Sequence, residues 1–139
     1  MPSATINGIG IQYDAQGEPE KGSVLLVSGL GMQLTSWSES FVRLLVGRGY
    51  RVVRMDNRDS GLSQSMDHAG VPVLAETVAA RRAGQTPDVP YTLDDMAADA
   101  AGLVETLELG RVHAVGASMG GMIAQLLALN HPERVASLV

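Results

Sequence analysis

The stretch RVHAVGASMGG, residues 111–121, decides the fold that the sequence predicts. Residues 111–116 have the pattern of a buried strand, and residues 120–129 are apolar and predict a helix. The turn between them, Gly116-Ala117-Ser118-Met119-Gly120, has the form Gly-x-Ser-x-Gly. A serine on so tight a strand-turn-helix connection needs glycine or small neighbours. The pattern therefore predicts a Ser118 hydroxyl held at a helix N-terminus, where backbone N–H groups stabilise negative charge. The alternative is a glycine-rich turn with a solvated serine.

Strand and helix patterns alternate on the N-terminal side of this stretch, as in βαβ units. We expect a hairpin turning at Asn7-Gly8, a helix over residues 92–109 capped by Thr92 and Asp95, and a polar loop over residues 57–71. The other expected strands are residues 23–28, 50–55 and 134–139, and the other expected helices are residues 36–48 and 74–83. The predicted fold class is α/β, a mostly parallel sheet of about six strands with flanking helices.

A second glycine-rich loop, Ser28-Gly29-Leu30-Gly31-Met32, follows the apolar strand of residues 23–28. Leu34 stands where a dinucleotide-binding fingerprint needs its third glycine, and the chain has no Gly-Lys-Ser or Gly-Lys-Thr triplet. We therefore expect no nucleotide cofactor. The loop fits better as the source of a backbone N–H, that of Leu30, aimed at the same oxyanion as the N–H of Met119.

Composition excludes several classes of partner. The chain has 139 residues, enough for one domain, with 45% hydrophobic residues and a net charge of −5. No basic cluster exceeds Arg81-Arg82, which argues against nucleic acid and anionic membranes. Residues 112–129 are apolar but include His113, Ser118 and Gln125, so we reject a membrane span.

The absence of cysteine and of a signal peptide at MPSATINGIG predicts a cytoplasmic protein. The acids Asp94, Asp95 and Asp99 have no convergent histidine, so we interpret them as helix-dipole and solubility charges and expect no metal site.

Several motifs in register resemble the α/β-hydrolase fold family of serine hydrolases. They are the loop of residues 28–32, the segments DNRDSGLS at 56–63 and YTLDDMA at 91–97, the turn GASMGG at 116–121, and HPERV at 131–135. The likeness is greatest to esterases, methylesterases and cofactor-free haloperoxidase-like members. It implies that Ser118 is the nucleophile, that Leu30 and Met119 form the oxyanion hole, and that Asp56 and Arg58 tie loops together.

The chain departs from the family in two respects. Ser28 stands where many members have histidine, so that histidine's loop contact is missing. In the family, moreover, the catalytic acid, the catalytic histidine and the lid that sets acyl preference all follow the elbow serine. We expect residues 1–139 to be the N-terminal half of such a domain, a truncated α/β-hydrolase fold ending within the sixth strand.

Three histidines are candidates for a base within these residues. His113 is expected inside the sheet layers, and His131 at the far end of the helix that follows the elbow. His68 follows the strand of residues 50–55 and so lies at the same sheet edge as Ser118; with Asp67 and Asp59 nearby it is a possible improvised base. The alternative for His68 is a solvated loop residue.

Three functions remain open. The first is a serine hydrolase of small carboxylic esters, weak or dependent on a partner because the acid and histidine are missing. The second is a catalytically silent, self-associating half-domain, and the third is a fragment complemented by a separate C-terminal half. Because truncation exposes a sheet edge and an uncovered sheet face, we expect a homodimer or higher homo-oligomer.

Overall fold

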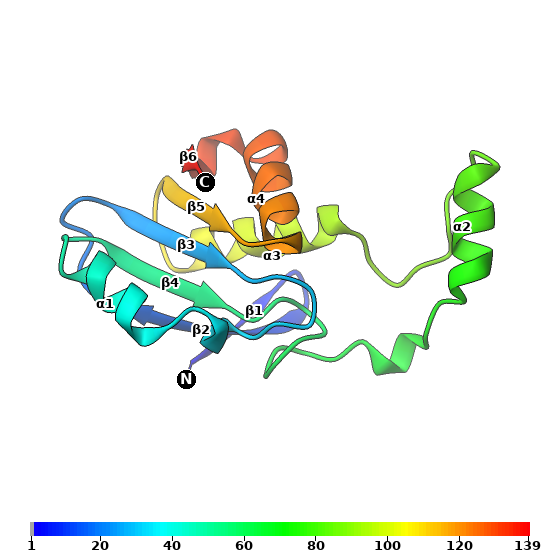
Figure 1. Ribbon diagram of the computed structural model, residues 1–139, viewed down its shortest axis with the longest axis horizontal. Coiled ribbons are helices and arrows are strands. Elements are labelled where there is room, and N and C mark those ends of the chain that lie inside the picture. The colour runs from blue at the N-terminus through cyan, green and yellow to red at the C-terminus, as the bar shows by residue number, and fades with distance from the viewer. Residues whose placement is uncertain (1) are drawn as a thin grey trace.

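A computed structural model describes residues 2–139 and contains one six-stranded sheet of order β1-β2-β4-β3-β5-β6 (Figure 1). The strands are β1 (Ser3–Ile6), β2 (Ile9–Gln16), β3 (Ser23–Val27), β4 (Arg51–Met55), β5 (Val112–Gly116) and β6 (Val135–Leu138). The first two form an antiparallel hairpin, and β3 to β6 pair in parallel. The expected α/β class with a mostly parallel sheet is confirmed. The hairpin turns at Asn7-Gly8 as predicted; of its two strands, β1 lies at an edge of the sheet, whereas β2 lies inside the sheet because it also pairs with β4.

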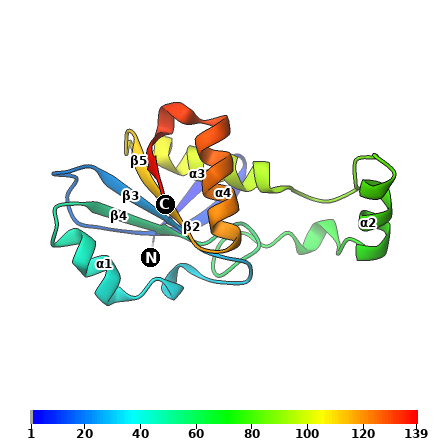
Figure 2. The same cartoon turned by 45° about the horizontal axis from the view of Figure 1, so that its top comes forward.

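The helices are α1 (Glu39–Val46), α2 (Leu74–Arg82), α3 (Leu93–Thr106) and α4 (Met119–Asn130), with short 3₁₀ turns at Leu34–Ser36, Asp67–Ala69 and Pro132–Arg134. Of these, α1 lies on one face of the sheet and α3 and α4 lie on the other, whereas α2 lies away from the sheet (Figure 2). The larger core lies between the sheet and α3 and α4, and a smaller one lies beneath α1. β3, at the centre, is buried along its whole length, which agrees with its unbroken apolar run.

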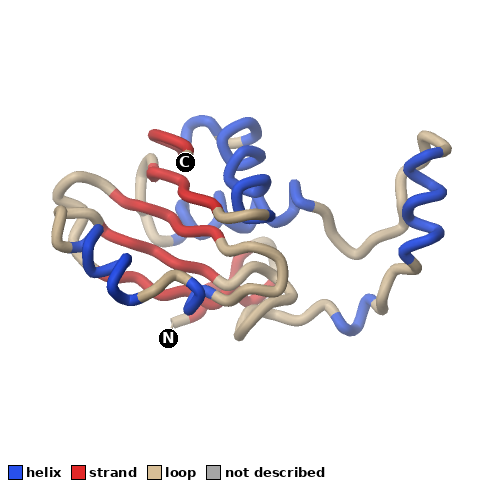
Figure 3. The backbone as a smooth tube through the Cα atoms, in the orientation of Figure 1, coloured by secondary structure: helices blue, strands red, loops and turns tan. Residues whose placement is uncertain are grey.

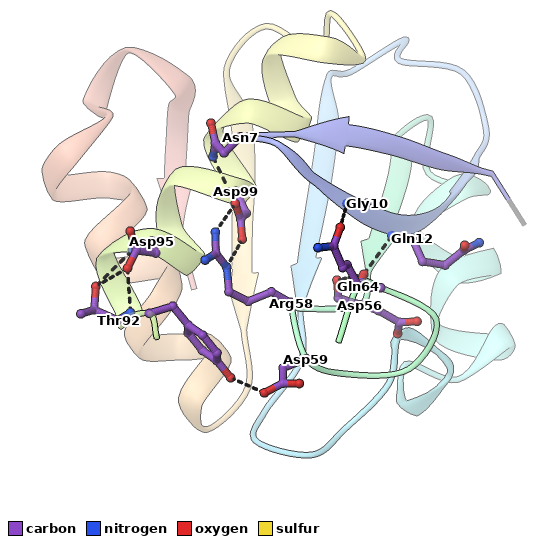
Figure 4. Close-up of polar contacts among 12 residues, drawn as sticks. Asn7, Gly10, Gln12, Asp56, Arg58, Asp59, Gln64, Thr92, Asp95 and Asp99 are labelled. Carbon is purple, nitrogen blue, oxygen red and sulfur yellow. Dashed lines mark hydrogen bonds and ion pairs between the residues drawn. The ribbon is translucent and has the colours of Figure 1, made fainter. Parts of the chain in front are cut away.

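The start of α3 shows why its boundary was readable from sequence. The Thr92 hydroxyl accepts a hydrogen bond from the Asp95 N–H, and the Asp95 carboxylate accepts one from the Thr92 N–H at 2.7 Å. This reciprocal capping box satisfies two backbone donors that a helix start otherwise leaves free. Figure 4 shows both residues at the beginning of α3.

Residues 67–90, hereafter the arm, stand off the sheet body. The arm includes the 3₁₀ turn Asp67–Ala69 and α2, and α2 has no buried residue. In Figures 1 and 3 it extends sideways from the strand ends and returns to α3. The helix that the sequence predicts at residues 74–83 is therefore present, but it lies outside the core.

Candidate active site

The Gly-x-Ser-x-Gly turn forms a strained elbow between β5 and α4. Ser118 has φ +55° and ψ −123°, a backbone conformation that side-chain-bearing residues rarely adopt. The Ala117 N–H donates to the carbonyl of Val27 at 3.1 Å, which ties the elbow to the end of β3. Ser118 itself is exposed, as its proposed role as nucleophile requires.

Two glycines of the elbow are sterically required. A Cβ on Gly120 would overlap the carbonyl of Val27, and one on Gly116 would overlap the backbone of Gly120. Neither glycine has a positive φ, so close approach of backbone rather than backbone conformation explains both. Gly121 differs, because its added Cβ would meet Gly116 only at 3.4 Å, an ordinary contact.

The second glycine-rich loop reaches the elbow directly. An added Cβ on Gly29 would lie 3.2 Å from the Cβ of Ser118, so this loop and the nucleophile elbow are in contact. Leu30, the next residue, is 79% exposed, and Met119 opens α4, where the first N–H has no acceptor within its own helix. The structure thus brings together Ser118 and the two residues predicted to supply the oxyanion hole.

Asp56 and Asn57 hold the loops around the elbow in place. The Asp56 carboxylate accepts from the Leu34 N–H at 2.6 Å and from the Leu62 N–H at 2.9 Å. The Asn57 amide donates to the Ser28 carbonyl at 2.9 Å, just before Gly29. Both side chains are buried, and the role of Asp56 as a loop tie agrees with the resemblance. The part played by Asn57 was missed in sequence.

Arg58 and Asp99 form a buried ion pair that connects three segments. The Arg58 guanidinium donates to both Asp99 oxygens, at 2.7 and 2.8 Å, and the Asn7 amide donates to Asp99 at 3.1 Å (Figure 4). Hydrogen bonds from Arg58 to Asp99 raise the pKa of Arg58 above its already high value, against the opposing effect of burial. Hairpin, loop and α3 are therefore joined at one carboxylate.

The interpretation of Asp99 as a solubility charge is wrong. Only 1% of the residue is exposed, because it lies on the inner face of α3. Its spacing from Met96 and Leu103, three residues before and four after, places it on their apolar face. That spacing was the signal that could have found it. Asp94 and Asp95 are exposed, as expected.

A cavity of about 690 Å³ opens beside the elbow, between the body and the arm. Leu30, Met119, Met96 and Leu126 line it from the body. Met119 therefore lines a large apolar pocket, whereas Met32 borders a separate cavity of about 100 Å³. Volume and lining of the larger cavity suit a small organic ligand.

The three histidines lie in different places. The His113 ring is 2.7 Å from the Ser137 hydroxyl on β6 and packs edge-on to Tyr50, as a satisfied sheet residue does. His131 ends α4. His68 is exposed in the arm's 3₁₀ turn. Among the hydrogen bonds of residues 2–139, none joins a histidine to Ser118.

Two further features are absent from the part of the chain that the structure describes. Within residues 2–139, no group of three or more histidine or acidic side chains is arranged to hold a metal ion. Across the same residues, no helix combines the length and apolar character needed to cross a membrane.

Comparison with known proteins agrees with this geometry. The pattern of the alpha/beta hydrolase fold family matches residues 22–139. Rhodomycin D methylesterase DnrP of Streptomyces peucetius is 33% identical over 140 residues, which cover 99% of this chain and 41% of that protein. The chain thus spans about two-fifths of this relative's length.

Solved structures show the same likeness. A hydrolase from Pseudomonas aeruginosa PA01 superposes with a TM-score of 0.75 at 29% identity, covering 99% of this chain and 43% of that one. The enol-lactonase of Burkholderia xenovorans LB400 has a TM-score of 0.71 at 29% identity, covering 96% of this chain and 44% of that one. The chain belongs to the alpha/beta hydrolase fold family.

Proposed function

We propose that this chain carries the nucleophile and oxyanion hole of a carboxylic ester hydrolase. One observation supports this above the others: Ser118 is exposed on a strained elbow, in contact with the loop that presents Leu30 and at the start of the helix that presents Met119. Backbone N–H groups at such a position stabilise the negative oxygen that develops during acyl transfer. The methylesterase and lactonase names of the relatives favour an ester of a small molecule as substrate.

In the proposed reaction, the Ser118 Oγ bonds to the ester carbonyl carbon and the carbonyl oxygen becomes the oxyanion. The bond to the alcohol oxygen then breaks, and the serine proton passes through a base to the departing alcohol. Water then attacks the carbonyl carbon of the acyl-serine, the same base takes the water's proton, and it returns that proton to the Ser118 Oγ as the bond to the acyl group breaks and the acid leaves. No metal, redox group or cofactor takes part in these steps.

The source of the base is a separate part of the proposal. None of the three histidines is joined to Ser118 by a hydrogen bond among residues 2–139, and His68 sits on the exposed arm. We propose that the catalytic histidine and acid come from residues outside this segment, in a longer chain or a separate fragment. A homodimer and a cytoplasmic location are further predictions for this chain.

The test is turnover of p-nitrophenyl acetate by the purified chain and its Ser118→Ala variant. We expect slow release of p-nitrophenol that falls to the buffer rate in Ser118→Ala, because loss of triad members typically reduces turnover by about 10⁴ to 10⁶. Ser40→Ala, an exposed serine on α1, is the matched control and should leave the rate unchanged. Turnover that survives Ser118→Ala would overturn the proposal.

Two further experiments distinguish the possible sources of the base. Loss of turnover in His68→Ala, with the fold intact, would assign the base to the arm. Turnover that appears only on addition of a fragment carrying a histidine and an acid would assign the base to that fragment. If the chain is a catalytically silent half-domain, neither experiment will show Ser118-dependent turnover.

A further inference from the structure

The arm is attached to the body at its two roots by one carboxylate. Asp59 accepts a hydrogen bond on Oδ1 from the N–H of Met66, directly before the arm, at 3.1 Å. It accepts another on Oδ2 from the hydroxyl of Tyr91, directly after the arm, at 3.0 Å (Figure 4). Asp59 itself has φ +65°, in the left-handed region that aspartate adopts more readily than most side-chain-bearing residues. One side chain thus fixes both the point where the 24-residue arm leaves the body and the point where it returns.

Tyr91 is held from a second side as well. The Arg58 guanidinium lies over its ring, 5.4 Å from the ring centre, while Arg58 itself is fixed by Asp99. Burial and the hydrogen bond to Asp59 both raise the pKa of Tyr91, so its hydroxyl stays protonated and donates at neutral pH. Contacts from Asp59 to Tyr91 and from Tyr91 to Arg58 therefore connect the roots of the arm to the Arg58–Asp99 ion pair of the body.

The arm also supplies one wall of the cavity beside the elbow. Thr77 and Arg81 of α2 and Thr86, Pro87 and Val89 of the returning segment line it, opposite Leu30 and Met119. The residues proposed to hold the oxyanion and the residues of the arm thus border one continuous space of about 690 Å³. A two-carbon acyl group would leave most of that volume empty, whereas ligand pockets of about 300–1,000 Å³ accommodate drug-sized molecules.

We infer that the arm determines which substrates this hydrolase accepts. The substrate is a bulky, largely apolar ester, and its non-reacting part lies between the arm and Leu30, Met119 and Leu126. This inference rests on the proposed function for the position of the reacting carbonyl. The apolar lining near the elbow favours an aromatic or alicyclic body over a charged one. Binding of this body holds the carbonyl at Ser118, so the arm acts through substrate positioning rather than chemistry.

The first experiment measures binding without turnover. In the Ser118→Ala background, methyl 2-naphthoate is titrated and its naphthalene fluorescence gives the dissociation constant. Val89→Asp places a charge on the cavity wall and should weaken binding about tenfold. Val78→Asp makes the same change on α2, at a residue outside the cavity lining, and should leave binding unchanged. Equal effects of the two substitutions, no effect of Val89→Asp, or no binding at all would overturn the inference.

A second variant guards against misfolding of Val89→Asp. Replacing residues 67–90 by Gly-Ser-Gly-Ser, which reaches about 14 Å, removes the wall and leaves the buried core intact, since α2 buries no residue. Binding of methyl 2-naphthoate should be lost, while the body still unfolds cooperatively in urea. Retained naphthoate binding would contradict the inference.

The same data distinguish this inference from the proposed function. If the naphthoate pattern holds but Ser118→Ala does not affect acetate turnover, the arm binds apolar esters and the nucleophile assignment fails. If Ser118-dependent turnover is present but naphthoate binding ignores the arm, only the inference about the arm fails.

Discussion

The elbow and the arm border the same cavity but are built in opposite ways. At the elbow, backbone packs on backbone so closely that Gly116 and Gly120 admit no side chain, and the flanking loops are tied by buried Asp56 and Asn57. In the arm, α2 buries nothing, and only the roots are fixed, by Asp59. Under the proposed function, the tightly packed body would hold the reacting groups in place, and the arm, which has no core contacts, would determine which molecules reach them.

The largest expected effect breaks the elbow. Gly120→Ala forces a methyl group into the carbonyl of Val27, so the β3–α4 contact must open, and we expect a loss of unfolding free energy on the order of 4 kcal/mol or more. Gly121→Ala, one residue on, should be neutral or stabilising by up to about 1 kcal/mol, because its Cβ has room and alanine favours helix. Urea denaturation compares the two. Similar losses in both variants would contradict the close-packing account.

The next effect tests the ion pair of Arg58 and Asp99 within the body. Asp99→Asn leaves the Arg58 charge buried without its partner and should reduce stability by about 3 kcal/mol. Asp94→Asn, the same change at an exposed position of α3, should cost less than about 0.5 kcal/mol. Thermal unfolding measures both. A loss in Asp99→Asn no larger than in Asp94→Asn would mean that Asp99 is a surface charge after all.

A pH effect is expected from the body alone. Burial raises the pKa of Asp14, but hydrogen bonds and the charge of Arg54 outweigh it, so its folded pKa lies below the unfolded value near 4. The stability that the ion pair of Asp14 and Arg54 contributes is thus fully present above the unfolded pKa and is lost as the pH falls through the folded pKa. Unfolding free energy should decline as the pH drops below about 5, and Asp14→Asn should flatten this decline. An unchanged acid limb in Asp14→Asn would contradict the assignment.

The smallest effect concerns the hydrogen bond between Tyr91 and Asp59 at the root of the arm. Tyr91→Phe removes one hydrogen bond to Asp59 and should change global stability by no more than about 1 kcal/mol. Amide hydrogen exchange over residues 67–90 should nevertheless accelerate, while exchange in β3 and β4 stays the same. Exchange that rises throughout the body, or nowhere, would show that Tyr91 does not hold the arm.

Local signals made much of the fold predictable. The unbroken apolar run of β3, the capping pair Thr92 and Asp95, and the small residues around Ser118 each specify their structure within a few residues. These local patterns predicted the element types correctly, whereas the assignment of the Leu30 and Met119 N–H groups to an oxyanion hole stays a prediction.

Features that depend on distant partners were not predictable in the same way. Asp99 looks like a solvated charge until Arg58, 41 residues away, is placed beside it. Arg54 likewise finds its partners Asp14 and Glu39 only through the pairing of β2 with β4 and the position of α1. The position of the arm away from the body was not predictable either. Its residues have a helix-forming pattern, but that pattern does not show that the helix lacks a core to pack against.

The central claim is that Ser118 is a nucleophile, and that the oxyanion formed from the ester carbonyl faces the N–H groups of Leu30 and Met119. The most direct test is a crystal structure of the chain after reaction with diethyl p-nitrophenyl phosphate, which leaves a diethylphosphoryl group on a reactive serine. We predict one adduct, on Ser118, with its phosphoryl oxygen about 3 Å from both nitrogens. An adduct on another residue, or a phosphoryl oxygen turned away from both N–H groups, would contradict the account.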